Sequence, residues 1–310
     1  MAQVEFTASE YQADGSIRPA AYVFAGSEVD GWEVRREGVP HVDLGPGYRL
    51  LAVSHCGVCA TDLSRRHLPF RLPQVTGHEV VARDHDGDAV VVEINASHAA
   101  RGLSEDAWCA HCRAGLSTHC PDRLVLGIHD LPGGFGPWIL APTRAAVPLG
   151  AAVDRRTSAL VEPFAAALHA VRTITPRAGD RIAVVGPGRL GSLVVAALAA
   201  ERTSTGIATE IVVVGRRADG LTRARALGAD VTLHADDALR HAGSVDVAIE
   251  TTGSPDGLAL ALGLATREVH VKSTTGLPTL GLRHLTALVV DEVSLGPLGG
   301  AAITDRKSVV

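Results

Sequence analysis

Arg181-Ile-Ala-Val-Val185 runs directly into Gly186-Pro-Gly-Arg-Leu-Gly191, and residues 192–200 are good helix formers. This order of strand, glycine-rich loop and helix predicts a dinucleotide-binding βαβ unit. Gly186 makes the tight turn, Gly188 lets the backbone approach a pyrophosphate, and Gly191 allows close packing of helix on strand. The helix begins with Arg189 and Leu190, and its N-terminus is expected to face the phosphates.

From residue 151 onward, the region that contains this loop, solid Val/Ile runs alternate with helix-like Ala/Leu stretches, a rhythm typical of buried parallel strands joined by helices. Upstream, to about residue 150, short alternating apolar runs broken by Gly, Pro and Asp indicate a mostly antiparallel β domain. We therefore predict an α/β protein of two domains, 1–150 and 151–297, with the boundary near 148–152. The first strand is expected at Ala21–Phe24, and no role is assigned to the residues before it.

The composition excludes several classes of partner. Net charge is −5, 20% of the residues are charged, and there is no basic stripe interleaved with aromatic residues. We therefore expect no nucleic-acid partner. The longest apolar run, 192–200, is far shorter than the roughly 20 residues of a membrane-spanning helix, and we expect no membrane association. The polar N-terminus lacks the layout of a secretory signal, which indicates a cytoplasmic protein.

The second predicted strand of the nucleotide domain, Ile211–Val214, is followed by Gly215-Arg216-Arg217 instead of the acidic residue that binds the ribose hydroxyls of NAD. Without a carboxylate the site does not repel a 2′-phosphate, and a guanidinium can hold one. Arg216 and Arg217 therefore favour NADP over NAD. The alternative is that both arginines belong to a solvated helix start.

All five cysteines lie in two clusters, Cys56 and Cys59, then Cys109, Cys112 and Cys120. An odd number of cysteines without an export signal favours metal binding over disulfides. The first cluster opens Cys59-Ala-Thr-Asp62, and two further segments follow it, Thr76-Gly-His-Glu79 and Val161-Glu-Pro-Phe-Ala165.

Together with the glycine loop, these segments resemble the zinc-dependent medium-chain dehydrogenase/reductase family, which includes alcohol, polyol and threonine dehydrogenases. The resemblance covers about residues 20–297. It implies a GroES-like mostly-β catalytic domain followed by a Rossmann domain with a doubly wound parallel sheet. It also implies a homodimer or homotetramer of the full-length parent.

The resemblance also implies the residues of the catalytic centre. A catalytic zinc would be held by Cys59, His78 and Glu79, with Glu162 reaching it directly or through water, and one position is left open as catalysis requires. Zinc as a Lewis acid would activate the hydroxyl or carbonyl of a small-molecule substrate while hydride passes to or from the nicotinamide. Thr61 would hand on the proton. Three neighbouring residues have other expected roles. Asp62 would orient the loop or a zinc-binding histidine, and Ser64 stands where relatives have a relay histidine. Cys56 is expected to be a small buried hydrophobic residue.

The second cysteine cluster matches three of four ligands in the family's structural-zinc lobe, Cys-x2-Cys-x2-Cys-x7-Cys. Its first position is Asp106, followed by Cys109, Cys112 and Cys120. A carboxylate can complete a tetrahedral zinc site, so we predict a second, structural zinc on these four residues. The alternative is a loop with three reduced cysteines and no metal.

The chain ends soon after two predicted strands at 269–276 and 289–295, where the family continues into its catalytic domain. Residues 305–310, Asp-Arg-Lys-Ser-Val-Val, are the translation of GATCGGAAGAGCGTCGTG, the start of a sequencing adapter. We expect 298–310 to be a non-native tail on a truncated chain.

These features predict a zinc-dependent NAD(P)-linked oxidoreductase that interconverts an alcohol, such as a polyol or amino-alcohol, and its carbonyl compound. The alternative is a catalytically silent nucleotide-binding fragment of such an enzyme, which would bind the cofactor without turnover.

Overall fold

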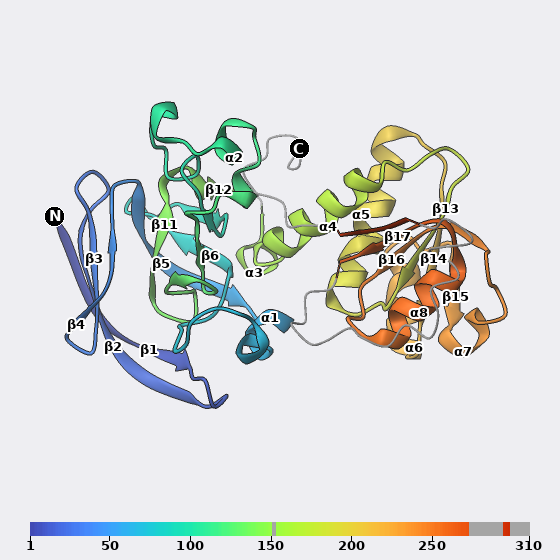
Figure 1. The fold of residues 1–310 in the computed structure, drawn as a ribbon, viewed down its shortest axis with the longest axis horizontal. Coiled ribbons are helices and arrows are strands. Elements are labelled where there is room, and N and C mark those ends of the chain that lie inside the picture. Colours follow the sequence, from blue (N-terminus) through green and yellow to red (C-terminus); the bar gives the residue numbers. More distant parts are fainter. Residues whose placement is uncertain (151–152, 273–293, 298–310) are drawn as a thin grey trace. The chain divides into compact units, whose positions relative to one another are not determined.

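The computed structural model describes residues 1–150, 153–272 and 294–297. Their contacts divide them into two compact units that separate between Glu162 and Pro163 (Figure 1). The division lies beyond the boundary predicted near 148–152 because a short helix, α3 (Arg155–Ser158), contacts strand β6 (Glu79–Arg83) of the first unit. The predicted tail, 298–310, lies outside the described residues.

The first unit is built almost entirely of β-strands, as the sequence predicts. Its sheets have the orders β1-β2-β3-β4, β11-β5-β6-β7-β12 and β10-β9-β8, and all pairs except β9 with β10 are antiparallel. One apolar core joins the first two sheets and includes Phe24, Leu51 and Ile139. The strands are β1 (Ala2–Tyr11), β2 (Ile17–Ser27), β3 (Gly31–Arg36), β4 (Val39–Leu44), β5 (Tyr48–Gly57), β6 (Glu79–Arg83), β7 (Ala89–Val92), β8 (Asn95–Ala96), β9 (Leu124–Leu126), β10 (Asp130–Leu131), β11 (Trp138–Pro142) and β12 (Ala146–Pro148).

Short helical turns connect these strands. Two are single α-helical turns that carry candidate metal ligands at their starts, α1 (Ala60–Leu63) and α2 (Ala110–Arg113). The 3₁₀ helices are Arg65–His67, Glu105–Ala107, Ser117–His119 and Thr143–Ala145.

The chain begins with a strand that the sequence prediction missed. β1 starts at Ala2, well before the strand expected at Ala21–Phe24, and pairs with β2 along its whole length. Glu10 occupies one of its core-facing positions and is fully buried. There it accepts hydrogen bonds from Tyr22 Oη at 2.7 Å and from Arg36 Nη2 at 2.7 Å. A charged residue at an inward position breaks the apolar alternation by which strands are predicted.

The second unit is a doubly wound parallel sheet, as predicted, with the strand order β15-β14-β13-β16-β17-β18. One face packs against α4, α5 and α6, and the other against α7 and α8. None of the helices in the described parts of the chain is long and apolar enough to cross a membrane. The elements are α4 (Val161–Ile174), β13 (Arg181–Val185), α5 (Arg189–Thr205), β14 (Glu210–Gly215), α6 (Ala218–Ala226), β15 (Val231–His234), α7 (Ala235–Ala238), β16 (Val245–Glu250), α8 (Pro255–Leu264), β17 (Ala265–Val271) and β18 (Ser294–Pro297).

The last strands differ from the predicted ranges. β17 starts before the strand expected at 269–276, and the end of that range lies outside the described residues. Only the final residues of the range 289–295 are described, at the start of β18, which pairs in parallel with β17.

Candidate metal and nucleotide sites

Cys59, His78 and Glu79 form a compact group in the first unit, and their ligand atoms lie within 4.8 Å of one another. Strand pairing brings them together, because Gly57 at the end of β5 pairs with Glu79 at the start of β6. A Cβ at position 57 would lie 2.0 Å from Glu79 Oε2, so only glycine leaves room for this carboxylate. A thiolate, an imidazole and a carboxylate are a donor set that binds zinc and leaves a fourth position open.

Asp62 fixes the two loops that carry these ligands. One carboxylate oxygen accepts a hydrogen bond from the backbone N–H of Cys59 at 2.8 Å, and the other accepts from the backbone N–H of Gly77 at 3.0 Å. Asp62 is only 4% exposed, so both hydrogen bonds are shielded from water. It therefore holds Cys59 and the residue before His78 at a fixed separation, and the predicted orienting role agrees with this geometry.

The surroundings of His78 suit a cation. Its Nδ1 atom is buried 3.4 Å from Asp62 Oδ1, but no hydrogen bond of normal geometry reaches it within the described structure. Burial lowers the pKa of His78, but contacts with Asp62 and Cys59 and the charge of Glu162 outweigh burial and raise the pKa well above its ordinary value. A buried imidazole among several acidic groups is an environment that a divalent metal ion would neutralise.

The other predicted catalytic residues lie around this group. Thr61 is in α1, and its Oγ1 lies 3.6 Å from Cys59 Sγ, which donates to it. Glu162 is in the first turn of α4 and influences His78 by its charge, but it is not part of the three-residue ligand group. Cys56 is half-buried against the core, and burial raises the pKa of its thiol to about 12. Ser64 follows α1 and caps its C-terminus.

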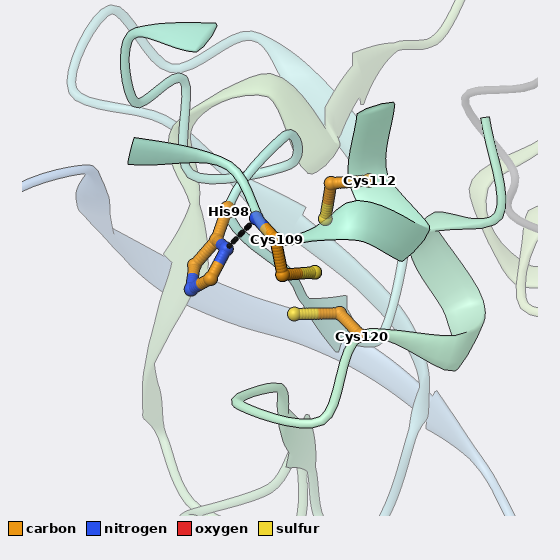
Figure 2. A group of neighbouring side chains, drawn as sticks. All are labelled: His98, Cys109, Cys112 and Cys120. Atoms are coloured by element: carbon orange, nitrogen blue, oxygen red, sulfur yellow. Dashed lines mark hydrogen bonds between the residues drawn. The ribbon is translucent and has the colours of Figure 1, made fainter. Parts of the chain in front are cut away.

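A second group of possible ligands lies in the loop between β8 and β9. The ligand atoms of His98, Cys109, Cys112 and Cys120 are within 4.8 Å of one another, and Figure 2 shows the three thiols converging beside the imidazole. Nδ1 of His98 accepts the backbone N–H of Cys109 at 3.1 Å, and Nε2 lies 3.4 Å from Oδ2 of Asp122. Three thiols and one imidazole are a common structural-zinc set.

The thiols of this group differ in acidity. The pKa of Cys109 is lowered, first because the backbone N–H of Cys112 stabilises its thiolate. Burial raises the pKa of Cys120 to about 11. Cys109 therefore loses its proton more easily than Cys120, and the thiolate is the form that binds metal.

The structure does not bring the predicted fourth ligand, Asp106, into this group. Asp106 lies in an exposed 3₁₀ turn, where its backbone carbonyl accepts from Arg113. The pairing of β8 with β9 instead places His98, just after β8, near Cys120, which precedes β9. The ligand spacing of the family, counted back from Cys109, leads to Asp106 and therefore misses His98. The available signal was a histidine four residues after Ile94, where the apolar run 89–94 ends.

The three glycines of the loop in the second unit have different steric surroundings. Gly186 has φ +98°, and a Cβ there would lie 2.5 Å from Thr252 Cγ2. A Cβ on Gly191 would lie 2.1 Å from the carbonyl oxygen of Gly186, so this glycine is needed for close packing. A Cβ on Gly188 would meet nothing within 4 Å, so this backbone is open to a ligand. Gly188 caps α5, whose first residues are the exposed Arg189 and the partly buried Leu190.

The two arginines after β14 have different surroundings. Arg216 is exposed, and in the part of the chain that the structure describes its guanidinium has no hydrogen-bond or ion-pair partner. Arg217, just before α6, is also exposed, but its guanidinium donates two hydrogen bonds to the carboxylate of Asp219. Nε donates to Oδ1 at 3.0 Å, and Nη2 donates to Oδ2 at 2.6 Å. Only Arg216 therefore has its charge free for a ligand.

The chain is similar to known proteins in sequence and in fold. Residues 45–151 match the family model described as the alcohol dehydrogenase GroES-like domain. (R,R)-butanediol dehydrogenase of Bacillus subtilis is 30% identical over 90% of both chains. L-threonine 3-dehydrogenase of Rhizobium johnstonii is 28% identical over 76% of this chain and 70% of its own. The fold is similar to that of a structure from Sinorhizobium meliloti 1021, described as a zinc-binding dehydrogenase bound to NADP, with a TM-score of 0.74 and 22% identity over 98% of this chain and 87% of that one.

Proposed function

The chain belongs to the zinc-dependent medium-chain alcohol, threonine and polyol dehydrogenases, and from this membership we propose that it oxidises an alcohol to its carbonyl compound, or the reverse, with zinc and NADP or NAD. The observation that carries the proposal is the convergence of Cys59, His78 and Glu79 from three positions on two loops. The donor set fits zinc, and the negatively charged surroundings of His78 fit a cation. The substrate class is a small alcohol such as a polyol or amino-alcohol, the class named for the relatives.

The residues around the metal group divide the work of the reaction. Bound zinc supplies Lewis acidity, which favours loss of a hydroxyl proton and polarises a carbonyl group. The Thr61 hydroxyl, next to Cys59, both accepts and donates hydrogen bonds and can receive the substrate proton and hand it on. Because Ser64 stands where relatives have the relay histidine, the proton would leave Thr61 for water. Asp62 keeps the ligand loops at the separation that the metal requires.

The second unit provides the cofactor site. The open backbone at Gly188 and the N-terminus of α5 can hold the pyrophosphate, because unpaired N–H groups and the helix dipole favour negative charge there. The nicotinamide supplies the carrier for hydride. Arg216, with its free guanidinium, favours NADP over NAD, since it can bind a 2′-phosphate.

We also propose a structural zinc in the first unit, with His98 as the fourth ligand in the position for which the sequence suggested Asp106. The three thiols and a ring nitrogen of His98 lie within 4.8 Å of one another. Nδ1 would bind the ion once its lone pair is released from the backbone N–H of Cys109. Asp122 would accept the other ring N–H of His98 and hold the ring in place, as carboxylates commonly do for zinc-bound histidines.

Elemental analysis together with turnover tests the proposal. The purified chain should contain two zinc ions and should oxidise members of a panel of alcohols, or reduce the matching aldehydes and ketones, with NADP or NAD. Cys59→Ser should remove one zinc and lower kcat/KM at least 100-fold, while NADPH binding stays within twofold. Cofactor binding by the zinc-loaded chain with no turnover across the panel would instead support the silent nucleotide-binding protein.

A further inference from the structure

The loop between β14 and α6 contains a carboxylate at a place where the cofactor preference is decided. In dinucleotide-binding folds, the residues after the second strand contact the adenosine ribose, where NAD has a hydroxyl and NADP a phosphate. Here that strand is β14, which ends at Gly215, and Asp219 lies in the first turn of α6. The first acidic residue after this strand is therefore Asp219, in the helix and not at the strand end.

Asp219 holds Arg217 through two hydrogen bonds to the same guanidinium, at 3.0 and 2.6 Å. A two-pronged arginine–carboxylate pair uses the same guanidinium edge that would bind a phosphate. Both side chains are mostly exposed, at 76% for Arg217 and 58% for Asp219, so water and salt weaken the pair. The carboxylate therefore competes with a ligand phosphate without excluding it.

We propose that Asp219 is a specificity-determining residue that limits the preference for NADP by occupying Arg217. A 2′-phosphate that engages Arg217 must displace Asp219 and then lies close to a carboxylate of the same sign of charge. NAD has only a hydroxyl at this position, so its binding requires no displacement of Asp219 and is not opposed by the charge of the carboxylate. The chain accordingly uses both cofactors, with Arg216 alone giving a modest advantage to NADP. This inference depends on the proposed use of a nicotinamide cofactor.

Removal of the carboxylate charge should increase the preference for NADP. The Asp219→Asn variant frees the guanidinium of Arg217, and the ratio of NADH to NADPH dissociation constants should rise about 3- to 10-fold, the range expected for an exposed ion pair plus one phosphate contact. Asp237→Asn is the matched control, because Asp237 also lies exposed in the first turn of a helix and pairs with an arginine, Arg240. The control should leave the ratio unchanged.

The experiment is a fluorescence titration of the full chain with NADPH and with NADH at 20 and 200 mM salt. In an Arg217→Gln background, Asp219→Asn should lose most of its effect, because there is no guanidinium left to release. An unchanged ratio in Asp219→Asn, or an equal rise with and without Arg217, overturns the proposal. Failure of the unmodified chain to bind either nucleotide would contradict the proposed function itself, which is a separate result.

Discussion

Asp62 gives the most direct test of the metal site, because a single carboxylate joins both ligand loops without being a ligand. Asp62→Asn keeps the size and shape of the side chain but replaces one acceptor oxygen with an NH2 group. Whichever way the amide turns, that NH2 group faces the backbone N–H of either Cys59 or Gly77. The variant therefore loses one charge-assisted hydrogen bond and places two donors against each other in a buried site.

The magnitude follows from these contacts. A hydrogen bond to a charged group contributes about 1.5–3 kcal/mol, and the site is shielded from water. Without metal the loops can relax to relieve the mismatch, but with metal Cys59 and His78 must keep their separation. Most of the cost therefore falls on the metal-bound form, and zinc affinity should fall about 10- to 150-fold, since each 1.4 kcal/mol is a factor of ten.

The assay is competition for zinc with a chromogenic chelator, with the thermal midpoint of the zinc-free chain measured in parallel. Asp84→Asn is the matched control, because Asp84 also accepts two backbone N–H groups, those of Asp86 and Asp88, in a turn outside both ligand groups. It should leave zinc affinity unchanged. If Asp62→Asn retains affinity within threefold, or loses affinity only in proportion to a lowered thermal midpoint, the positioning argument fails.

Three further outcomes follow from the geometry. His98→Ala should remove one of two zinc ions per chain, whereas Asp106→Asn should retain both, as counted by elemental analysis; equal loss from the two variants would contradict the ligand assignment. Gly191→Ala should weaken NADPH binding at least tenfold in a titration, since its Cβ would lie 2.1 Å from a carbonyl oxygen of the glycine loop. Burial raises the pKa of Glu10, but hydrogen bonds from its arginine and tyrosine partners outweigh burial and lower the pKa below its ordinary value of 4.5. The ionised carboxylate therefore stabilises the fold above about pH 4.5, and this stabilisation is lost as the pH falls through the lowered pKa. Glu10→Gln should therefore reduce the free energy of unfolding by about 3 kcal/mol at pH 7, with the difference from the unmodified chain narrowing in denaturant titrations below pH 4.

The nucleotide domain could be predicted closely from sequence because its signals are local. The strand β13 has the predicted bounds, Arg181–Val185, since an apolar run with three β-branched residues ends at a glycine. Gly186 and Gly191 are required by contacts within a few residues or with one neighbouring strand. Cys59, His78 and Glu79, which the family resemblance implies as ligands of one metal, lie close together in the structure. Each of them stands in a short segment with a recognisable pattern.

The missed features depend on contacts between distant parts of the chain. His98 becomes a ligand candidate only through the pairing of β8 with β9, which no count of residues within the cysteine cluster reveals. β1 was missed because Glu10 interrupts its apolar face, and the arginine that compensates this charge, Arg36, is two strands away. The ion pair between Arg217 and Asp219 is local in sequence. The sequence alone, however, does not indicate whether Asp219 pairs with Arg216 or with Arg217.

Strand register also explains why Cys59, His78 and Glu79 lie close together. Val53 pairs with Ala82, but His55 pairs with Val81, so Ser54 is an extra residue in β5, and its hydroxyl donates to the Val81 carbonyl at 2.9 Å. Without this bulge the register would place Cys56, and not Gly57, opposite Glu79. Any side chain at position 57 would collide with the Glu79 carboxylate, and a cysteine opposite it would face the same crowding. A bulge redirects side chains at the end of a strand. Here it places Gly57, which has no side chain, opposite the Glu79 carboxylate, which fills the space that a side chain at position 57 would take.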